Sequence, residues 1–280
     1  MIEILQQRLD RYRVGNALEQ EHALKEILQE VGLYALWRAD FFDVAAFQGG
    51  TSLRILQRLP RFSEDLDFIL KTPDPGFNWQ RYLDPMTAVL TEFGLRSELP
   101  DKSRMDNAVR TAVLKDDSIS QQLNLEFVHG PADKKLRIKL EIDVNPPAGS
   151  GFAYTYLDFP LDHEVCHQDL ASNFALKIHA LLCRPYLKGR DWFDFGWYVA
   201  QDVHPNLPLL QAALLQQGPW RDQPLVVDVA WLQATLQHKL ASIDWQAAAE
   251  DVWRFLAPAQ QHSLRLWSAG LFSAKVGKLG

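Results

Sequence analysis

The sequence predicts an α/β (α+β) chain, with a mixed sheet domain first and a helical domain after it. Apolar residues recur at helical spacing through residues 16–37. They alternate with polar residues, as in strands, through residues 65–70 and 135–144. After residue 169 strand patterns nearly vanish. A helical half therefore follows a half that contains the sheet.

In the first half, we expect helices and strands in alternation. Helices are expected at residues 1–13, 16–37, 51–57 and 79–93, and strands at 44–47, 65–70, 95–99, 108–114, 122–128 and 135–144. The turns between the later strands, 116–117 and 129–133, are short, which suits hairpins better than crossovers. The sheet should therefore be mixed or largely antiparallel.

The second half begins after a break rich in Pro and Gly at residues 145–151 and a stretch of short extended pieces at 152–168. Helices are then expected at residues 169–182, 192–200, 207–215, 224–240, 245–256 and 258–266. We predict a sheet domain over about residues 1–150 and a helical domain over about 165–280.

Composition limits the possible functions. The chain has 280 residues, 47% of them hydrophobic, and no apolar run of membrane-spanning length. The start lacks the apolar core and cleavage site of a signal peptide, and the two cysteines make neither a disulfide framework nor a zinc site. A cytoplasmic protein is therefore expected. The net charge of −6 argues against a general nucleic-acid coat, although a local basic groove remains compatible with it.

The chemistry is concentrated between residues 47 and 70. Gly49 and Gly50 follow a short apolar run, and a phosphate can approach their backbone at the start of a helix. Asp65 and Asp67 are two residues apart in a predicted strand and so share a face. Two adjacent carboxylates favour a cation between them, and hard oxygen ligands suit Mg²⁺. Alone, each feature also fits a solvated edge or an ordinary turn.

Taken together, the stretch GGTSLRILQRLPRFSEDLDF resembles the signature of the AbiEii/AbiGii-type nucleotidyltransferases, in the DNA polymerase beta-like superfamily. Many members of this family are toxins of bacterial type IV toxin–antitoxin, or abortive-infection, systems. The resemblance implies a nucleotidyltransferase-like domain that transfers NMP from an NTP to an acceptor hydroxyl with Mg²⁺ or Mn²⁺. The residues expected to bind the nucleotide here are Gly49, Gly50, Thr51, Ser52, Arg61 and Ser63.

The resemblance also implies a third carboxylate on a neighbouring strand, which supports the metal and activates the attacking hydroxyl. Asp143 is our choice, and Glu141 shares its face and stays an alternative. The predicted metal ligands are thus Asp65 and Asp67 with one of these two residues.

A second family element matches FALKIHALLCRPYLKGRDWFDFGWYV. By resemblance, Lys177 contacts the triphosphate and Asp191 supports the active site, while Arg190 and Asp194 are weaker candidates. From the residues alone, Asp191 could simply cap a helix and Lys177 could be a surface lysine. We expect the active site in a cleft between the two domains.

The acceptor is predicted to be RNA, at the 3′ end of tRNA, because family members are implicated in tRNA modification. Three basic groups near the predicted site suit an RNA backbone, although solvated faces explain each alone. They are Arg54, Arg58 and Arg61; Lys134, Lys135, Arg137 and Lys139; and Lys188 and Arg190. An antitoxin encoded nearby is a possible partner. Alternatives are a protein or small-molecule acceptor, a non-catalytic nucleotide-binding member, and a metal nuclease.

Overall fold

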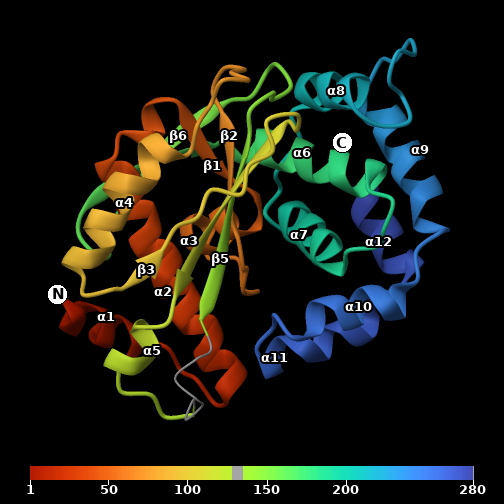
Figure 1. Ribbon diagram of the computed structural model, residues 1–280. Helices are drawn as coiled ribbons and strands as arrows, with labels where there is room; N and C mark the ends of the chain where they lie inside the picture. Colours follow the sequence, from red (N-terminus) through yellow and green to blue (C-terminus); the bar gives the residue numbers. More distant parts are fainter. Residues whose placement is uncertain (128–134, 280) are drawn as a thin grey trace. The chain divides into compact units, whose positions relative to one another are not determined.

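The computed structural model describes residues 1–127 and 135–279 (Figure 1). The predicted turn at residues 129–133 and Lys134 lie outside this part of the chain. By its contacts the chain divides into two compact units. The first consists of residues 1–58, 62–146 and 153–167, and the second of residues 59–61, 147–152 and 168–280. Each unit is described by itself.

The first unit contains the strands and the first five α-helices. Its helices are α1 (Ile2–Leu9), α2 (Ala17–Arg38), the 3₁₀ turn η1 (Phe41–Asp43), α3 (Gly49–Gln57), α4 (Gln80–Glu92) and α5 (Ile119–Gln122). Its strands are β1 (Ala45–Gln48), β2 (Leu66–Leu70), β3 (Ser97–Glu98), β4 (Val109–Asp116), β5 (Leu136–Asp143), β6 (Phe152–Leu157) and β7 (His163–Gln168), the last two of which each have one residue in the second unit.

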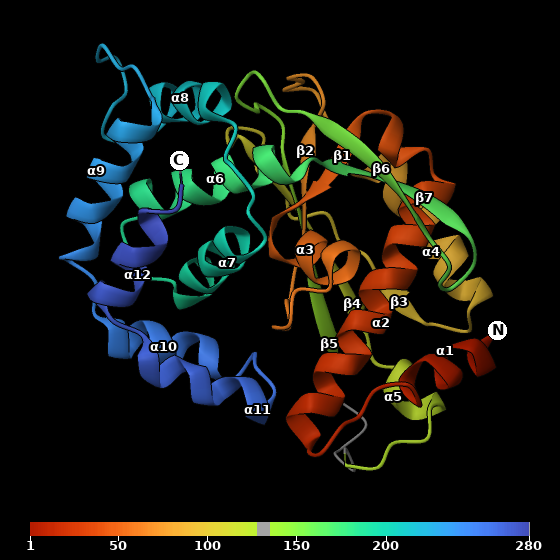
Figure 2. The same ribbon diagram turned by 180° about the vertical axis from the view of Figure 1, so that it is seen from behind.

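Within the described residues these strands form one sheet of order β3-β4-β5-β2-β1-β7-β6. β2 runs parallel to β5, and β1 runs parallel to β7. The pairs β1–β2, β3–β4 and β4–β5 are antiparallel. The predicted mixed sheet is therefore confirmed. Figure 2 shows β6 and β7 beyond β1, at the edge of the sheet.

Apolar and charged residues alternate between the two faces of the sheet on β5. On β5, Ile138, Leu140 and Ile142 are fully buried, and the residues between them are charged. The helices α2 and α4 lie side by side over the apolar face (Figures 1 and 2). Gly32 of α2 lies close to both α4 and the sheet, since a Cβ there would lie 3.3 Å from the Met86 side chain and 3.5 Å from that of Leu66. The acidic residues of β2 and β5 thus come to lie on the opposite face.

The second unit is helical. Its helices are α6 (Leu170–Cys183), α7 (Gly189–Ala200), α8 (Leu207–Gln216), α9 (Val229–Leu240), α10 (Trp245–Trp253), α11 (Pro258–Gln261), the 3₁₀ turn η2 (His262–Leu266) and α12 (Ala269–Val276). Aromatic rings fill its core: Trp245 stacks on Phe272 with centroids 4.4 Å apart, and both rings contact Trp192. These tryptophans are packing residues.

Several expected elements differ from the structure. The predicted strand at 122–128 is wrong over its described residues, because Gln122 ends α5 and no strand follows before residue 128. The cause is local: the Asp116 carboxylate accepts bonds from the Ser118 and Ile119 amides at 2.9 and 2.8 Å, which starts a helical turn. The helix predicted from 224 begins at Val229, and α12 was not predicted. No described helix has the length and apolar character needed to span a bilayer.

Candidate active site

The predicted site residues fall into two sets, one in each unit. In the first unit, the parallel pairing of β2 and β5 places Asp67 directly opposite Glu141, and Ile69 opposite Asp143. Residues opposite each other in a sheet share a face, as do residues two apart. Asp65, Asp67, Glu141 and Asp143 therefore belong to the same charged face, with Asp67 and Glu141 as nearest neighbours.

Gly49 lies against Asp67. It is the first residue of α3 and has φ of +76°, a conformation that favours glycine. A Cβ at this position would lie 2.7 Å from Oδ2 of Asp67, so no larger residue fits without a shift. The preceding residue, Gln48, pairs with Asp67 between β1 and β2. The start of a helix, with its partial positive charge, therefore lies beside this carboxylate.

The next residues of α3 tie the helix to the acidic strand. The buried hydroxyl of Thr51 donates to the carbonyl oxygen of Asp65, the residue just before β2. The Ser52 hydroxyl donates to the Gly49 carbonyl at 2.9 Å. The Ser63 carbonyl accepts a bond from the Gln29 side chain at 3.1 Å, which holds the loop to α2. These contacts fix where Asp65 enters the sheet.

Lys139 stands among the acids. Its Nζ lies 2.6 Å from Oε1 of Glu141. Burial lowers the pKa of Lys139, but Glu141, Asp65 and Asp67 outweigh it, so the pKa is raised. Asp143 accepts a bond from the Asn145 amide at 2.9 Å. Within residues 1–127 and 135–279, no three His, Cys, Asp or Glu side chains are grouped so as to hold a metal ion.

In the second unit, a buried network of charges surrounds Asp194 of α7. Arg61 binds this carboxylate through Nε and Nη2, each at 2.6 Å, and Lys177 of α6 lies 2.9 Å from it. Asp194 is fully buried and Arg61 is 2% exposed. Burial raises the pKa of Asp194, but the two cations outweigh it and the pKa falls below its usual value. The carboxylate therefore stays charged.

Asp191, one turn earlier on α7, continues the network. Its Oδ1 lies 2.9 Å from Nζ of Lys177, and its Oδ2 accepts a bond from Arg184. Burial raises the pKa of Asp191, but the charges of Lys177, Arg184 and Lys188 outweigh this effect and lower the pKa to about 2. Lys188 is the N-cap residue of α7, so Asp191 is not its cap. Lys177 thus binds two carboxylates, and its contact with a triphosphate stays a prediction.

The basic residues expected to follow an RNA backbone are mostly paired with acids. Arg54 binds Glu26 at 2.7 Å, and Arg61 binds Asp194. Lys135 binds Glu98 at 2.7 Å, and Lys139 binds Glu141. The guanidinium of Arg190 lies over the Phe255 ring, 4.3 Å from its centroid.

Two residues make more contacts with the predicted site residues than the sequence indicated. Asp194 is the centre of the buried network, although only its spacing from Asp191 marked it. Lys139 was predicted as one of a basic group suited to an RNA backbone. Its period-two spacing from Glu141 was the signal that it shares the face of the acids.

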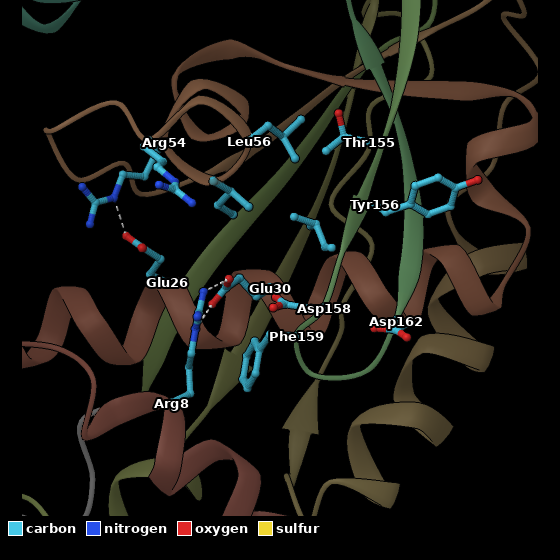
Figure 3. Close-up of a pocket in the computed structure, with 13 residues that line it drawn as sticks. Arg8, Glu26, Glu30, Arg54, Leu56, Thr155, Tyr156, Asp158, Phe159 and Asp162 are labelled. Carbon is cyan, nitrogen blue, oxygen red and sulfur yellow. Dashed lines mark hydrogen bonds and ion pairs between the residues drawn. The ribbon is translucent and has the colours of Figure 1, made fainter.

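A cavity of about 850 Å³ lies in the first unit. Arg54 and Arg58, which were expected to suit an RNA backbone, line it, whereas none of the predicted metal ligands or nucleotide-binding residues does. Figure 3 shows two hydrogen-bonded ion pairs among the residues that line the cavity, Arg8 with Glu30 and Arg54 with Glu26. Burial, together with Glu26 and Asp158, raises the pKa of Glu30 to about 7 even though Arg8 lowers it. The folded chain therefore holds a proton on Glu30 at pH values where the unfolded chain has released it.

We expect the Glu30→Gln variant to lose a pH dependence that the native chain has. Because the pKa of Glu30 is higher in the folded chain, the native free energy of unfolding falls as pH rises from about 4.5 to about 7, by up to ~3 kcal/mol from this group. Urea denaturation of both proteins at pH 5, 6 and 7 measures the difference. Parallel pH profiles would contradict the expectation.

The chain is similar to solved structures of other proteins. The chain is similar over 91% of its length to an H. pylori protein provisionally assigned as a nucleotidyltransferase, with a TM-score of 0.49, 15% identity and 93% of that chain covered. It is also similar to JHP933 from Helicobacter pylori, with a TM-score of 0.46 and 14% identity, covering 91% of this chain and 89% of that one. No curated protein matches the chain.

A family model provides the stronger result. The model described as the nucleotidyl transferase AbiEii toxin of type IV toxin–antitoxin systems matches residues 32–267. The match includes the glycines of α3, the acids of β2 and β5 and the network around Asp194. The predicted resemblance is confirmed, and the chain belongs to the AbiEii nucleotidyltransferase toxin family.

Proposed function

We propose that this nucleotidyltransferase uses Mg²⁺ and transfers NMP from an NTP to an acceptor hydroxyl, with the first-unit acids as its catalytic groups. The observation that carries the proposal is the arrangement at Asp67. This residue lies opposite Glu141 in the sheet and against Gly49 at the start of α3. Carboxylates for a metal and a glycine backbone for a phosphate are thereby close together.

The chemistry of these side chains suits a hard cation. Asp65 and Asp67, with Asp143 or Glu141, would offer carboxylate oxygens, the ligands that Mg²⁺ prefers. The raised pKa of Lys139 also indicates that this face favours positive charge. When bound there, Mg²⁺ would supply charge neutralisation for the triphosphate.

In the proposed reaction, the acceptor oxygen forms a bond to the α-phosphorus of the NTP. The bond from that phosphorus to the bridging oxygen breaks, and pyrophosphate leaves with the electron pair. Asp143 or Glu141 accepts the proton of the attacking hydroxyl and later releases it to water. The amides at the start of α3, around Gly49 and Gly50, orient the phosphates. Catalysis then depends mainly on positioning and charge.

For the acceptor, we propose RNA, at the 3′ end of tRNA. Family membership supports this choice, and it also implies an antitoxin as a partner. The pairing of Arg54 and Lys135 with acids weighs against a broad basic groove. We therefore propose that few backbone phosphates are contacted, and that affinity depends only weakly on salt.

The experiment is incubation of the protein with each labelled NTP, Mg²⁺, and total RNA, protein or no acceptor. We expect label on RNA of tRNA size and release of pyrophosphate. Label on protein or on a small molecule would replace RNA by that acceptor. NTP binding without pyrophosphate release would contradict transfer, and shortened RNA would indicate a nuclease.

A further inference from the structure

A second cavity, of about 240 Å³, lies in the second unit beside the connection between α6 and α7. Three of the side chains that line it are cationic: Arg184, Lys188 and Lys239. The one acidic residue in its lining is Asp191. The charge of this cavity is therefore positive before any ligand is considered.

The acid in the lining neutralises only one of these cations. Asp191 is already bound by Lys177 and Arg184. Among the described residues, Lys188 and Lys239 have no carboxylate within 4 Å. Two ammonium groups in the lining therefore lack an anionic partner, which is unfavourable in a partly desolvated place.

The position of Lys188 adds to this excess. It is the N-cap residue of α7, a helix of 12 residues, and a cation at a helix N-terminus is opposed by the helix dipole. Burial and the charges of Lys177, Arg190 and Arg184 lower the pKa of Lys188, with Asp191 opposing them. An anion in the cavity would relieve both effects at once.

The size of the cavity indicates what kind of anion fits. Sites for whole small molecules measure about 300–1,000 Å³, and this one is smaller. Guanidinium and ammonium groups together bind phosphate oxygens well. Tyr186, an exposed residue, also lines the cavity, and the guanidinium carbon of Arg184 lies 5.2 Å from the centroid of its ring.

We infer that this cavity binds a phosphate group, held by Arg184, Lys188 and Lys239, of a nucleotide or of a nucleic acid. Naming these two sources rests on the proposed function, because a transferase that acts on RNA binds both a nucleotide and a nucleic acid. The inference that the cavity binds a phosphate group does not depend on the proposed function. The residues that line this cavity belong to the second unit, and the acids of β2 and β5 belong to the first.

The test is calorimetric titration of the full chain with inorganic pyrophosphate in EDTA, so that no metal can recruit the anion to the acidic residues. We expect saturable binding that weakens about tenfold or more in Lys188→Gln and in Lys239→Gln. Lys278→Gln, an exposed lysine of the same unit outside the cavity, is the matched control and should bind as the native chain does. Thermal unfolding confirms that each variant is folded.

Equal affinity in all four proteins, or no binding in the native chain, would overturn the inference. Displacement of pyrophosphate by ATP identifies a nucleotide phosphate, and displacement by a short RNA identifies an acceptor phosphate. Displacement by neither also overturns it. Because the titration needs no turnover, an inactive protein that binds pyrophosphate would refute the proposed function and leave this site standing.

Discussion

The Asp67→Asn variant should lose nucleotide transfer by about a thousandfold or more while keeping its fold. Asn has the same shape but no charge, so the position would lose the anionic group that we propose as a metal ligand, without creating a cavity. Charge stabilisation by such a metal is worth several kcal/mol, and each 1.36 kcal/mol is about a factor of ten in rate. The measurement is pyrophosphate release with the labelled NTP and the acceptor that the labelling experiment identifies.

Asp84→Asn, on the exposed surface of α4 in the same unit, is the control and should keep native activity. The same assay separates the two possible third carboxylates. If Asp143 is the base and ligand, Asp143→Asn should be as inactive as Asp67→Asn, and Glu141→Gln should retain most activity. The reverse result would assign Glu141. Undiminished transfer by Asp67→Asn would refute the site.

The Asp194→Ala variant should be destabilised by about 3–5 kcal/mol. Removing one partner of a buried ion pair leaves an uncompensated buried charge. Here Arg61 would lose both of its bonds at 2.6 Å, and Lys177 would keep only Asp191. Urea denaturation followed by circular dichroism measures the loss.

Two further proteins sharpen that result. Asp251→Ala removes a partly exposed acid 4.0 Å from Arg190 and should cost no more than about 1 kcal/mol. The double variant Arg61→Met with Asp194→Leu removes both charges and should be more stable than Asp194→Ala, since no buried guanidinium is left unpaired. If Asp194→Ala were as stable as Asp251→Ala, the network would have no role in stability.

Much of the first unit was predictable because its signals are local. Period-two alternation predicts β2 and β5 and puts their acids on one face. The same reasoning failed at residues 122–127, where the Asp116 side chain starts a helical turn that alternation does not reveal. Register was also out of reach. That Glu141 lies opposite Asp67, with Asp143 two pairs further along, depends on the pairing of strands distant in sequence.

The network in the second unit shows the other limit. Arg61 and Asp194 are 133 residues apart, and neither spacing nor periodicity can show that they meet. The sequence did draw attention to both, through the motifs in which they occur. Their mutual contact is a property of the folded chain, and the predicted role of Arg61 in binding the nucleotide stays a prediction.

Residues 59–61 belong by their contacts to the helical unit, although residues on both sides of them belong to the sheet unit. A fragment that stops near residue 150 would therefore carry Arg61 without Asp194, and the remaining fragment would carry Asp194 without Arg61. Each fragment would therefore expose a charged side chain, Arg61 or Asp194, that is buried and paired in the full chain. The two fragments should be more soluble when they are mixed than when either is alone. A division of the chain into two stable fragments should therefore not be made at the Pro- and Gly-rich break at residues 145–151.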